Sequence, residues 1–167
     1  MPFDLTDPEQ LALRAPAYAL AFAEARHALD AQEQMMRDLI ARAGLLMAAA
    51  AVTTSVFVGQ ALAHGRAGPA AWLGIAAFAG VGLAVVDVLW PRAGWELEAW
   101  ATDVLTEYIE PAGIPLAMIQ RDLAIHRAAS FRRNLAGLRR ASRSLRIGMC
   151  SLVVETLAWL VAVATVI

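Results

Sequence analysis

Three stretches of the chain are apolar almost throughout and carry very few charged residues: residues 43–63, 67–90 and 147–167. They are 21, 24 and 21 residues long. A helix of about 20 apolar residues is long enough to cross the roughly 30 Å hydrocarbon core of a bilayer. The pattern therefore predicts an all-α integral membrane protein with three transmembrane helices.

Upstream of the first span, apolar residues recur at alternating spacings of four and three, the heptad pattern of packed helices. Asp7, Pro8 and Glu9 form a typical helix start, and Pro16 is expected to kink or restart the helix. No breaker separates the heptad pattern from the span, so we predict one continuous helix from about Pro16 to Ala63. The apolar seam comprises Leu11, Ala15, Tyr18, Phe22, Ala25, Leu29, Gln32, Met36 and Leu39.

The segment between the second and third spans has the same character. Residues 94–110 place apolar side chains on one helical face, residues 111–115 contain the prolines and glycine of a turn, and a long helix then returns to the third span. Residues 16–42 and 115–146 are 27 and 32 residues long, so we predict that they pack side by side as a cytoplasmic stalk. The seam of the returning helix comprises Ala124, Ala128, Phe131, Leu135, Leu138, Ser142 and Leu145.

The distribution of basic residues predicts the topology. The net charge is −1, and all 14 basic residues are arginines. Four precede the first span, one lies in the loop after it, and nine lie between the second and third spans. By the positive-inside rule, residues 1–42 form a cytoplasmic amphipathic helix and residues 91–146 a cytoplasmic helical hairpin, with spans at 43–63, 67–90 and 147–167. The C-terminus is then external, and the acidic N-terminus does not have the form of a signal peptide.

Glu155 is the most informative single residue, because it lies nine residues beyond Arg146 and so about 13 Å into the third span. An acid at that depth costs about 2.5–3.5 kcal/mol on insertion scales. Thr53 and Thr54 of the first span lie at the same depth and carry hydroxyl donors. Three interpretations stay open: a hydrogen bond that joins the helices, an oligomer interface or hydrated pore, and a proton relay.

Asp87 lies near the cytoplasmic end of the second span, at the depth of Arg42 and Arg146, and we expect an interfacial ion pair with them. The arginine-rich face next to the third span is a topology signal that also suits anionic lipid or a phosphorylated ligand such as a signal nucleotide. Its contact residues are Arg132, Arg133, Arg139, Arg140 and Arg143, with Arg146 beside them.

Other chemistry is not indicated. The phosphate-binding, metalloprotease and serine-hydrolase motifs do not occur, so we expect neither an enzyme nor a cofactor. His27 and His126 are offset by about 8 Å along the predicted stalk, too far to share a metal ion. Cys150 is the only cysteine, and we interpret it as a small apolar residue of the third span. The balanced charge indicates no nucleic-acid partner.

The arrangement of residues 30–167 resembles the Pycsar transmembrane effectors and the related SLATT-type domains of bacterial nucleotide-signalling defence. The resemblance rests on Arg37-Asp-Leu-Ile-Ala-Arg-Ala-Gly-Leu-Leu46 leading into a span, a tight hairpin, and a second span that ends in Leu89-Trp-Pro-Arg92. The family's Asp-x-Lys-Ala pattern is replaced in this chain by Ile40-Ala-Arg-Ala43, without the acid.

This resemblance implies a homo-oligomer of the bacterial inner membrane that associates on a cyclic-nucleotide signal and compromises the membrane. The residues leave two other classes open. In one, the spans only anchor a structural or regulatory protein whose stalk binds another protein. In the other, the chain is a subunit of an ion or proton translocator, which requires Glu155 to titrate.

Overall fold

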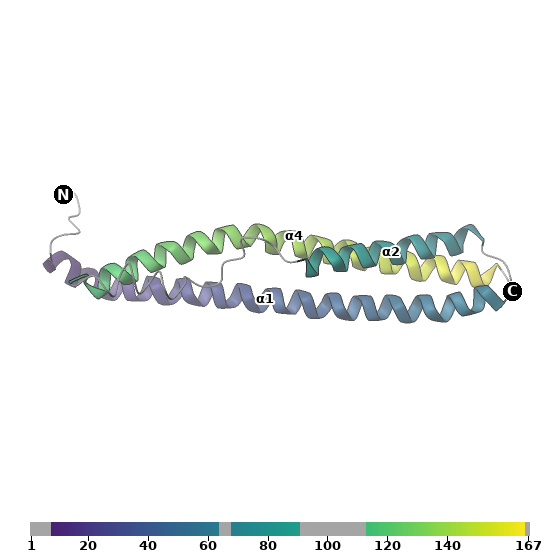
Figure 1. Cartoon of the computed structure of the whole chain (residues 1–167), viewed down its shortest axis with the longest axis horizontal. Helices are drawn as coiled ribbons and strands as arrows, with labels where there is room; N and C mark the ends of the chain where they lie inside the picture. The colour runs from purple at the N-terminus through teal and green to yellow at the C-terminus, as the bar shows by residue number, and fades with distance from the viewer. Residues whose placement is uncertain (1–7, 64–67, 91–112, 166–167) are drawn as a thin grey trace. The chain divides into compact units, whose positions relative to one another are not determined.

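The computed structural model describes residues 8–63, 68–90 and 113–165 of the 167-residue chain. Its three described elements are all helices: α1 (Pro8–Ala63), α2 (Pro69–Leu89) and α4 (Leu116–Ala164) (Figure 1). Each is long and apolar enough to cross a membrane. The predicted all-α fold with three candidate spans is therefore confirmed, whereas the predicted helix at residues 94–110 lies outside the described residues.

Helix α1 begins at Pro8, as the helix start predicted from Asp7, Pro8 and Glu9 requires. It runs without interruption to Ala63 and includes Pro16, so of the kink or restart expected at this proline, the restart is wrong. Proline lacks an N–H group, so the helix loses the one hydrogen bond that would end on the carbonyl of Ala12. The long stretches of good helix formers on both sides keep the helix continuous. Asp7, the expected cap, lies outside the described residues.

The ends of the other two helices follow from proline and glycine. Pro69 occupies the first turn of α2, where its missing N–H has no partner to lose. At the other end Trp90 is extended, with φ −60° and ψ 125°, because the following Pro91 disfavours helical backbone at the residue before it. Gly113 has φ +96°, a left-handed conformation that glycine adopts without strain, and α4 begins three residues later.

The described helices belong to two compact units, and α1 and α4 contribute residues to both. The first, called the stalk unit, comprises Met1–Met35 and Arg92–Gly137. The second, called the membrane unit, comprises Met36–Pro91 and Leu138–Ile167.

In the stalk unit, α1 and α4 bury a mixture of small apolar and polar side chains. Every residue of the predicted α1 seam in this unit is buried or half-buried. The amide Nε2 of Gln32 donates to the carbonyl of Phe131 at 3.0 Å, and the Arg127 guanidinium lies 4.4 Å from the centre of the Phe22 ring. Among the residues of this unit that the structure describes, the buried ones are Leu11, Leu29, Gln32, Ala117, Ala124, Ser130 and Asn134.

The seam predicted on this part of α4 is wrong at one residue. Ala124 is buried and Phe131 and Leu135 are half-buried, but Ala128 is exposed. The polar neighbour Asn134 is buried more deeply than Leu135. The prediction uses only the apolar residues of the sequence, whereas the packed helices also bury polar side chains between them. A one-residue shift moves a side chain by about 100° around a helix, which is enough to exchange core for surface.

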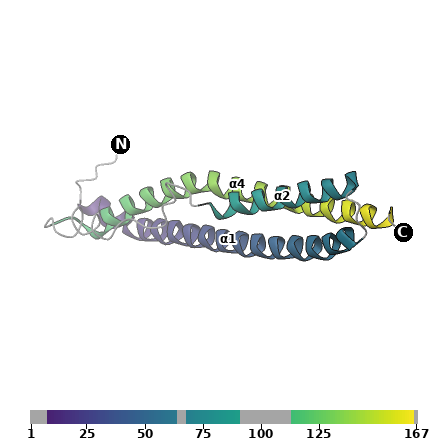
Figure 2. The same ribbon diagram turned by 45° about the vertical axis from the view of Figure 1, so that its right-hand side comes forward.

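In the membrane unit, the three helices pack around one apolar core. Its buried residues are Ala43, Leu46, Ala50, Val81, Val85, Val88 and Leu145. Close contacts pair α1 with α4 in parallel, from Leu46 against Gly148 to Thr54 against Glu155. Helix α2 runs antiparallel to α4 and lies alongside its C-terminal part in both views (Figure 2). The sequence thus forms a closed three-helix membrane unit.

Candidate functional site

The membrane unit exposes apolar side chains on its outer surface and buries one acid in its apolar core. On α4, Glu155 is fully buried with 0% exposure, while Leu157, two residues later, is 57% exposed. Val153, Leu160 and Val161 on the same helix are likewise exposed. A soluble protein avoids an exposed apolar patch of this extent, but surrounding hydrocarbon tolerates it. We therefore treat this unit as a lipid-embedded body whose apolar core contains one buried carboxyl group.

The buried carboxyl of Glu155 bonds to α1. The hydroxyl Oγ1 of Thr54 donates to Oε1 of Glu155 at 2.6 Å. The second oxygen, Oε2, is buried and has no hydrogen-bond partner among the residues that the structure describes. Interhelical hydrogen bonds in membranes contribute about 0.6 kcal/mol on average and up to about 1.7 kcal/mol. This contact therefore joins the first and third spans within a single chain.

Two aromatic side chains pack against each other inside the membrane unit, one helical turn beyond the Glu155 carboxyl. Trp159, four residues after Glu155 and on the same face of α4, is 1% exposed. Its ring stacks on Phe57 of α1, with centroids 6.2 Å apart and planes 5° from parallel. On the α2 side there is room for the ring only because residue 74 is glycine: a Cβ there would lie 2.8 Å from Trp159 Cε2. The Glu155 carboxyl thus lies next to a tightly packed aromatic layer.

Thr53 and Thr54, the predicted partners of Glu155, are both half-buried, but the hydroxyl of Thr54 makes the hydrogen bond and Thr53 does not donate to this carboxyl. A hydrogen bond within one chain favours the first of the three interpretations, a carboxyl that joins the helices. The pore, oligomer-interface and relay roles stay predictions. Sequence reasoning missed Trp159 and Phe57, although the i,i+4 spacing of Glu155 and Trp159 was a usable signal.

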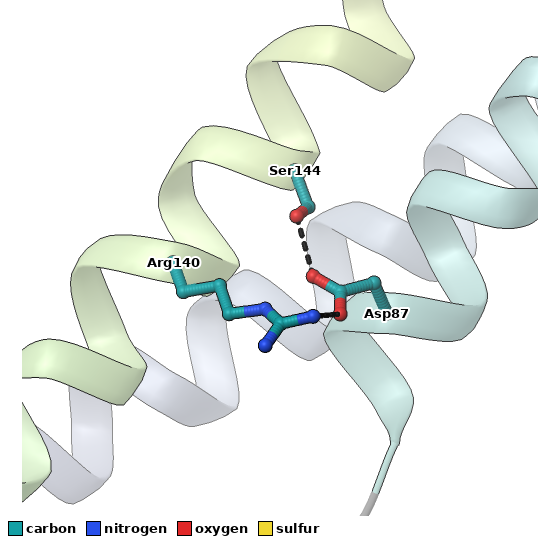
Figure 3. Close-up of polar contacts among 3 residues, drawn as sticks. All are labelled: Asp87, Arg140 and Ser144. Carbon is teal, nitrogen blue, oxygen red and sulfur yellow. Dashed lines mark hydrogen bonds and ion pairs between the residues drawn. The ribbon is translucent and has the colours of Figure 1, made fainter.

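Asp87 forms the second polar cluster of the membrane unit (Figure 3). Its Oδ1 accepts from Arg140 Nη2 at 2.8 Å, and its Oδ2 accepts from Ser144 Oγ at 2.5 Å. The expected partners were Arg42 and Arg146, so the ion pair has formed with a different arginine. Arg140 and Ser144 are four residues apart and share one face of α4. Arg146 lies two residues beyond Ser144, about 200° around the helix from it. The prediction considered only depth in the membrane, and it therefore named the wrong arginine.

A double-mutant cycle separates the two contacts of Asp87. We expect a coupling energy of about 1.5 kcal/mol between Asp87→Asn and Ser144→Ala, because this hydrogen bond is short and shielded. The coupling between Asp87→Asn and Arg140→Gln should be about 0.5 kcal/mol, since the arginine side chain is 72% exposed. Equilibrium unfolding in mixed micelles measures both values. A larger coupling to Arg140 than to Ser144 would contradict this ranking.

The arginine face is divided between the two units. In the stalk unit, Arg132 donates to the carbonyl of Ala128 at 3.4 Å and Arg133 to Ser130 Oγ at 3.2 Å. In the membrane unit, Arg140 pairs with Asp87, while Arg139 and Arg143 are exposed. His27 and His126 are both exposed. Residues 8–63, 68–90 and 113–165 contain no group of three or more histidine, cysteine or acidic side chains placed to hold a metal ion.

Comparison with protein-family models, with curated proteins and with solved structures gives no match to this chain. Its own structure therefore carries the functional argument. Three candidate membrane-spanning helices indicate a multi-pass membrane protein.

Proposed function

We propose that this chain is a non-enzymatic membrane protein that forms homo-oligomers and disturbs the membrane barrier when its cytoplasmic helices receive a signal. The observation that carries the proposal is that the membrane unit buries Glu155 fully and exposes leucines and valines on its outer surface. Each chain buries this acid within its own three-helix core. The outer surface then remains free for lipid or for further copies.

One face of α1 is suited to contact between copies. Five small residues lie on it at spacings of four, three, four and four, and all are exposed: Gly44, Ala48, Ala51, Ser55 and Gly59. A Cβ built at Gly44 or Gly59 meets nothing within 4 Å. Transmembrane helices associate through such small-residue faces, because close approach of two backbones maximises van der Waals contact. This face supports assembly through the first span.

Helix continuity supports the signalling part of the proposal. Pro8–Ala63 and Leu116–Ala164 are each one helix, and each contributes residues to both units. The arginine distribution favours a cytoplasmic stalk with an external C-terminus in a bacterial inner membrane. A ligand or protein that changes the packing of the stalk helices therefore acts on helices that continue into the membrane. The resemblance to nucleotide-signalling effectors makes a cyclic nucleotide the first signal to test.

Bulky residues on the small-residue face should block assembly. We expect Ala48→Leu/Ser55→Leu to lower the oligomeric fraction about tenfold, since close helix contact is lost. The measurement is energy transfer between differently tagged copies in liposomes. The matched control is Ala49→Leu/Val56→Leu, which enlarges exposed residues on another part of α1. In cells, a membrane-potential dye should report depolarisation for wild type and the control on signal addition, but not for the test variant.

Two results would overturn this proposal. One is a monomeric chain at every protein-to-lipid ratio. The other is an unchanged membrane potential during induced expression, with and without cyclic nucleotides, in every variant.

The alternative function is a membrane-anchored partner protein, and a feature of the stalk unit favours it. Leu13 and Leu20 lie seven residues apart on one face of α1 and are 78% and 64% exposed. Exposed leucines at heptad spacing are typical of a helix that packs against another helix. If this function holds, the purified chain stays monomeric and binds a defined protein through this face. Leu13→Gln/Leu20→Gln should then abolish that binding and leave the membrane unit intact.

A further inference from the structure

The membrane unit has an open groove on its outer surface, between α2 and α4. The groove has a volume of about 390 Å³. Ala77 of α2 forms one wall, and Ile147, Cys150 and Val154 of α4 form the other. The hollow arises because Ala77 and Cys150 have short side chains where two helices would otherwise fill the space. Ile147, Cys150 and Val154 are exposed, so the groove is open to the surrounding lipid.

Two arginines border the cytoplasmic end of this groove. Arg143 and Arg146 both line it and both are exposed. Within the described part of the chain, neither guanidinium forms a hydrogen bond or ion pair. Arg140, one turn earlier, differs in this respect because Asp87 neutralises it. The groove therefore combines an apolar channel with two unneutralised positive charges at the depth of lipid headgroups.

We propose that this groove binds an anionic phospholipid, with its phosphate on Arg143 and Arg146 and one acyl chain along Ile147, Cys150 and Val154. The dimensions agree, since Val154 lies eight residues and about 12 Å beyond Arg146 along the helix. Guanidinium groups bind phosphate through two parallel hydrogen bonds. This inference requires only that the membrane unit lies in a bilayer, and it is independent of the assembly and signalling proposed above.

A bound phospholipid accounts for both the two arginines and the apolar walls of the groove. A free phosphate or a helix from a second copy does not account for both. A free phosphate would use the two arginines but leave the apolar walls without a partner. A helix from a second copy would need acidic residues opposite Arg143 and Arg146. The small-residue face of α1, where we propose that copies meet, carries no acid along its length (Gly44, Ala48, Ala51, Ser55 and Gly59).

The first test removes the charges. Native mass spectrometry of the purified full-length chain, titrated with phosphatidylglycerol in detergent micelles, measures bound lipid directly. We expect Arg143→Gln/Arg146→Gln to weaken binding about 30-fold, the combined effect of two arginines near a membrane surface. The control Arg14→Gln/Arg26→Gln removes the same charge from exposed arginines of α1 outside the groove and should bind within about twofold of wild type. Equal losses in both pairs would overturn the proposal.

The second test fills the groove without changing its charge. Ala77→Leu should reduce phosphatidylglycerol binding about tenfold, because the added side chain occupies the space for the acyl chain. Ala76→Leu, at an exposed neighbour on α2, is the control and should bind as wild type does. Binding of glycerol phosphate as tightly as phosphatidylglycerol would show an anion site instead of a lipid site. Equal binding of phosphatidylcholine would likewise contradict the proposal, since it has no net negative charge.

The single cysteine allows a test on the otherwise unchanged protein. Cys150 lines the groove, so a bound lipid should slow its alkylation by N-ethylmaleimide about tenfold in the presence of phosphatidylglycerol. Phosphatidylcholine should slow it less than twofold. The control protein, Cys150→Ala/Ala76→Cys, carries its thiol outside the groove and should show no such protection. A rate at Cys150 that does not depend on phosphatidylglycerol would overturn the proposal even if the substituted variants fail to fold.

Discussion

Replacing Gly148 by valine is expected to destabilise the membrane unit by about 3 kcal/mol, a larger loss than we expect from any substitution at Glu155 or Thr54. Gly148 lies where all three spans meet. A Cβ at this position would lie 2.8 Å from Leu46 Cδ2 of α1 and 3.1 Å from Ala84 Cβ of α2. Real Cβ atoms essentially never approach as closely as the first of these distances. The buried Leu46 side chain must therefore change its conformation, and Ala84, which has no rotamer to change, can give way only if its backbone moves by a few tenths of an ångström. Both changes weaken the packing that holds a membrane bundle together.

The control for this prediction is Gly82→Val. Gly82 lies within the second span, and a Cβ there meets nothing within 4 Å. Both substitutions place the same β-branched residue in a helix, so the difference between them reports tertiary packing alone. Unfolding by sodium dodecyl sulfate in mixed micelles, followed by circular dichroism, measures both free energies. Equal stability of the two variants would mean that the close approach at Gly148 is not a feature of the folded protein.

Replacing Glu155 by alanine is expected to destabilise the membrane unit by about 2 kcal/mol, the next largest effect. The change removes the hydrogen bond from Thr54 and leaves a cavity at a fully buried position. Glu155→Gln should cost less than about 0.5 kcal/mol, because glutamine keeps the size of the side chain and an oxygen that accepts from Thr54. The comparison separates the presence of this polar side chain from its acidity.

Thr54→Val provides the matching change on α1. Valine preserves the shape of threonine and removes the hydroxyl donor, so we expect a loss of about 1 kcal/mol. Combined with Glu155→Ala, the second substitution should then have little further effect, because the hydrogen bond is already absent. Thr53→Val is the control at the neighbouring, half-exposed position and should be close to neutral. Additive losses for Thr54→Val and Glu155→Ala would contradict the contact between them.

The same variants also distinguish the possible roles of Glu155 in cells. If the carboxyl only joins α1 to α4, Glu155→Gln should depolarise the membrane as wild type does when the signal is present. A pore or relay that depends on the acid predicts instead that Glu155→Gln abolishes the change in potential while the protein remains folded. The membrane-potential dye together with the unfolding measurement decides between these outcomes.

The helices of the described chain are largely determined by local sequence. Apolar stretches about 20 residues long predict the spans, and Pro69 and the Trp90–Pro91 pair set the ends of α2. Each of these signals depends on residues that are close together in the chain, so it can be recognised before the tertiary structure is known. Pro16 is the exception, because the strength of the surrounding helix decides whether a single lost hydrogen bond interrupts it.

The side-chain partners could not be read in the same way. The sequence placed Asp87 at the depth of several arginines, but the rotation of α4 selects Arg140 and Ser144 over Arg146. The same rotation buries Asn134 and exposes Ala128 in the stalk unit. Depth in a membrane follows from residue number, whereas facing direction depends on how neighbouring helices pack, and a shift of one residue changes it by about 100°.

By itself, the sequence determined that this is a helical, multi-pass membrane protein with an acid deep in its third span, because the cost of transferring residues to hydrocarbon depends mainly on their identity and order. Only the tertiary structure decided that Glu155 faces Thr54 inside the unit, that Gly148 lies where the three spans meet, and that Arg143 and Arg146 border an open groove. The reason is that such contacts join residues far apart in the chain, and packing three helices together selects one set of facing side chains among many that the sequence allows.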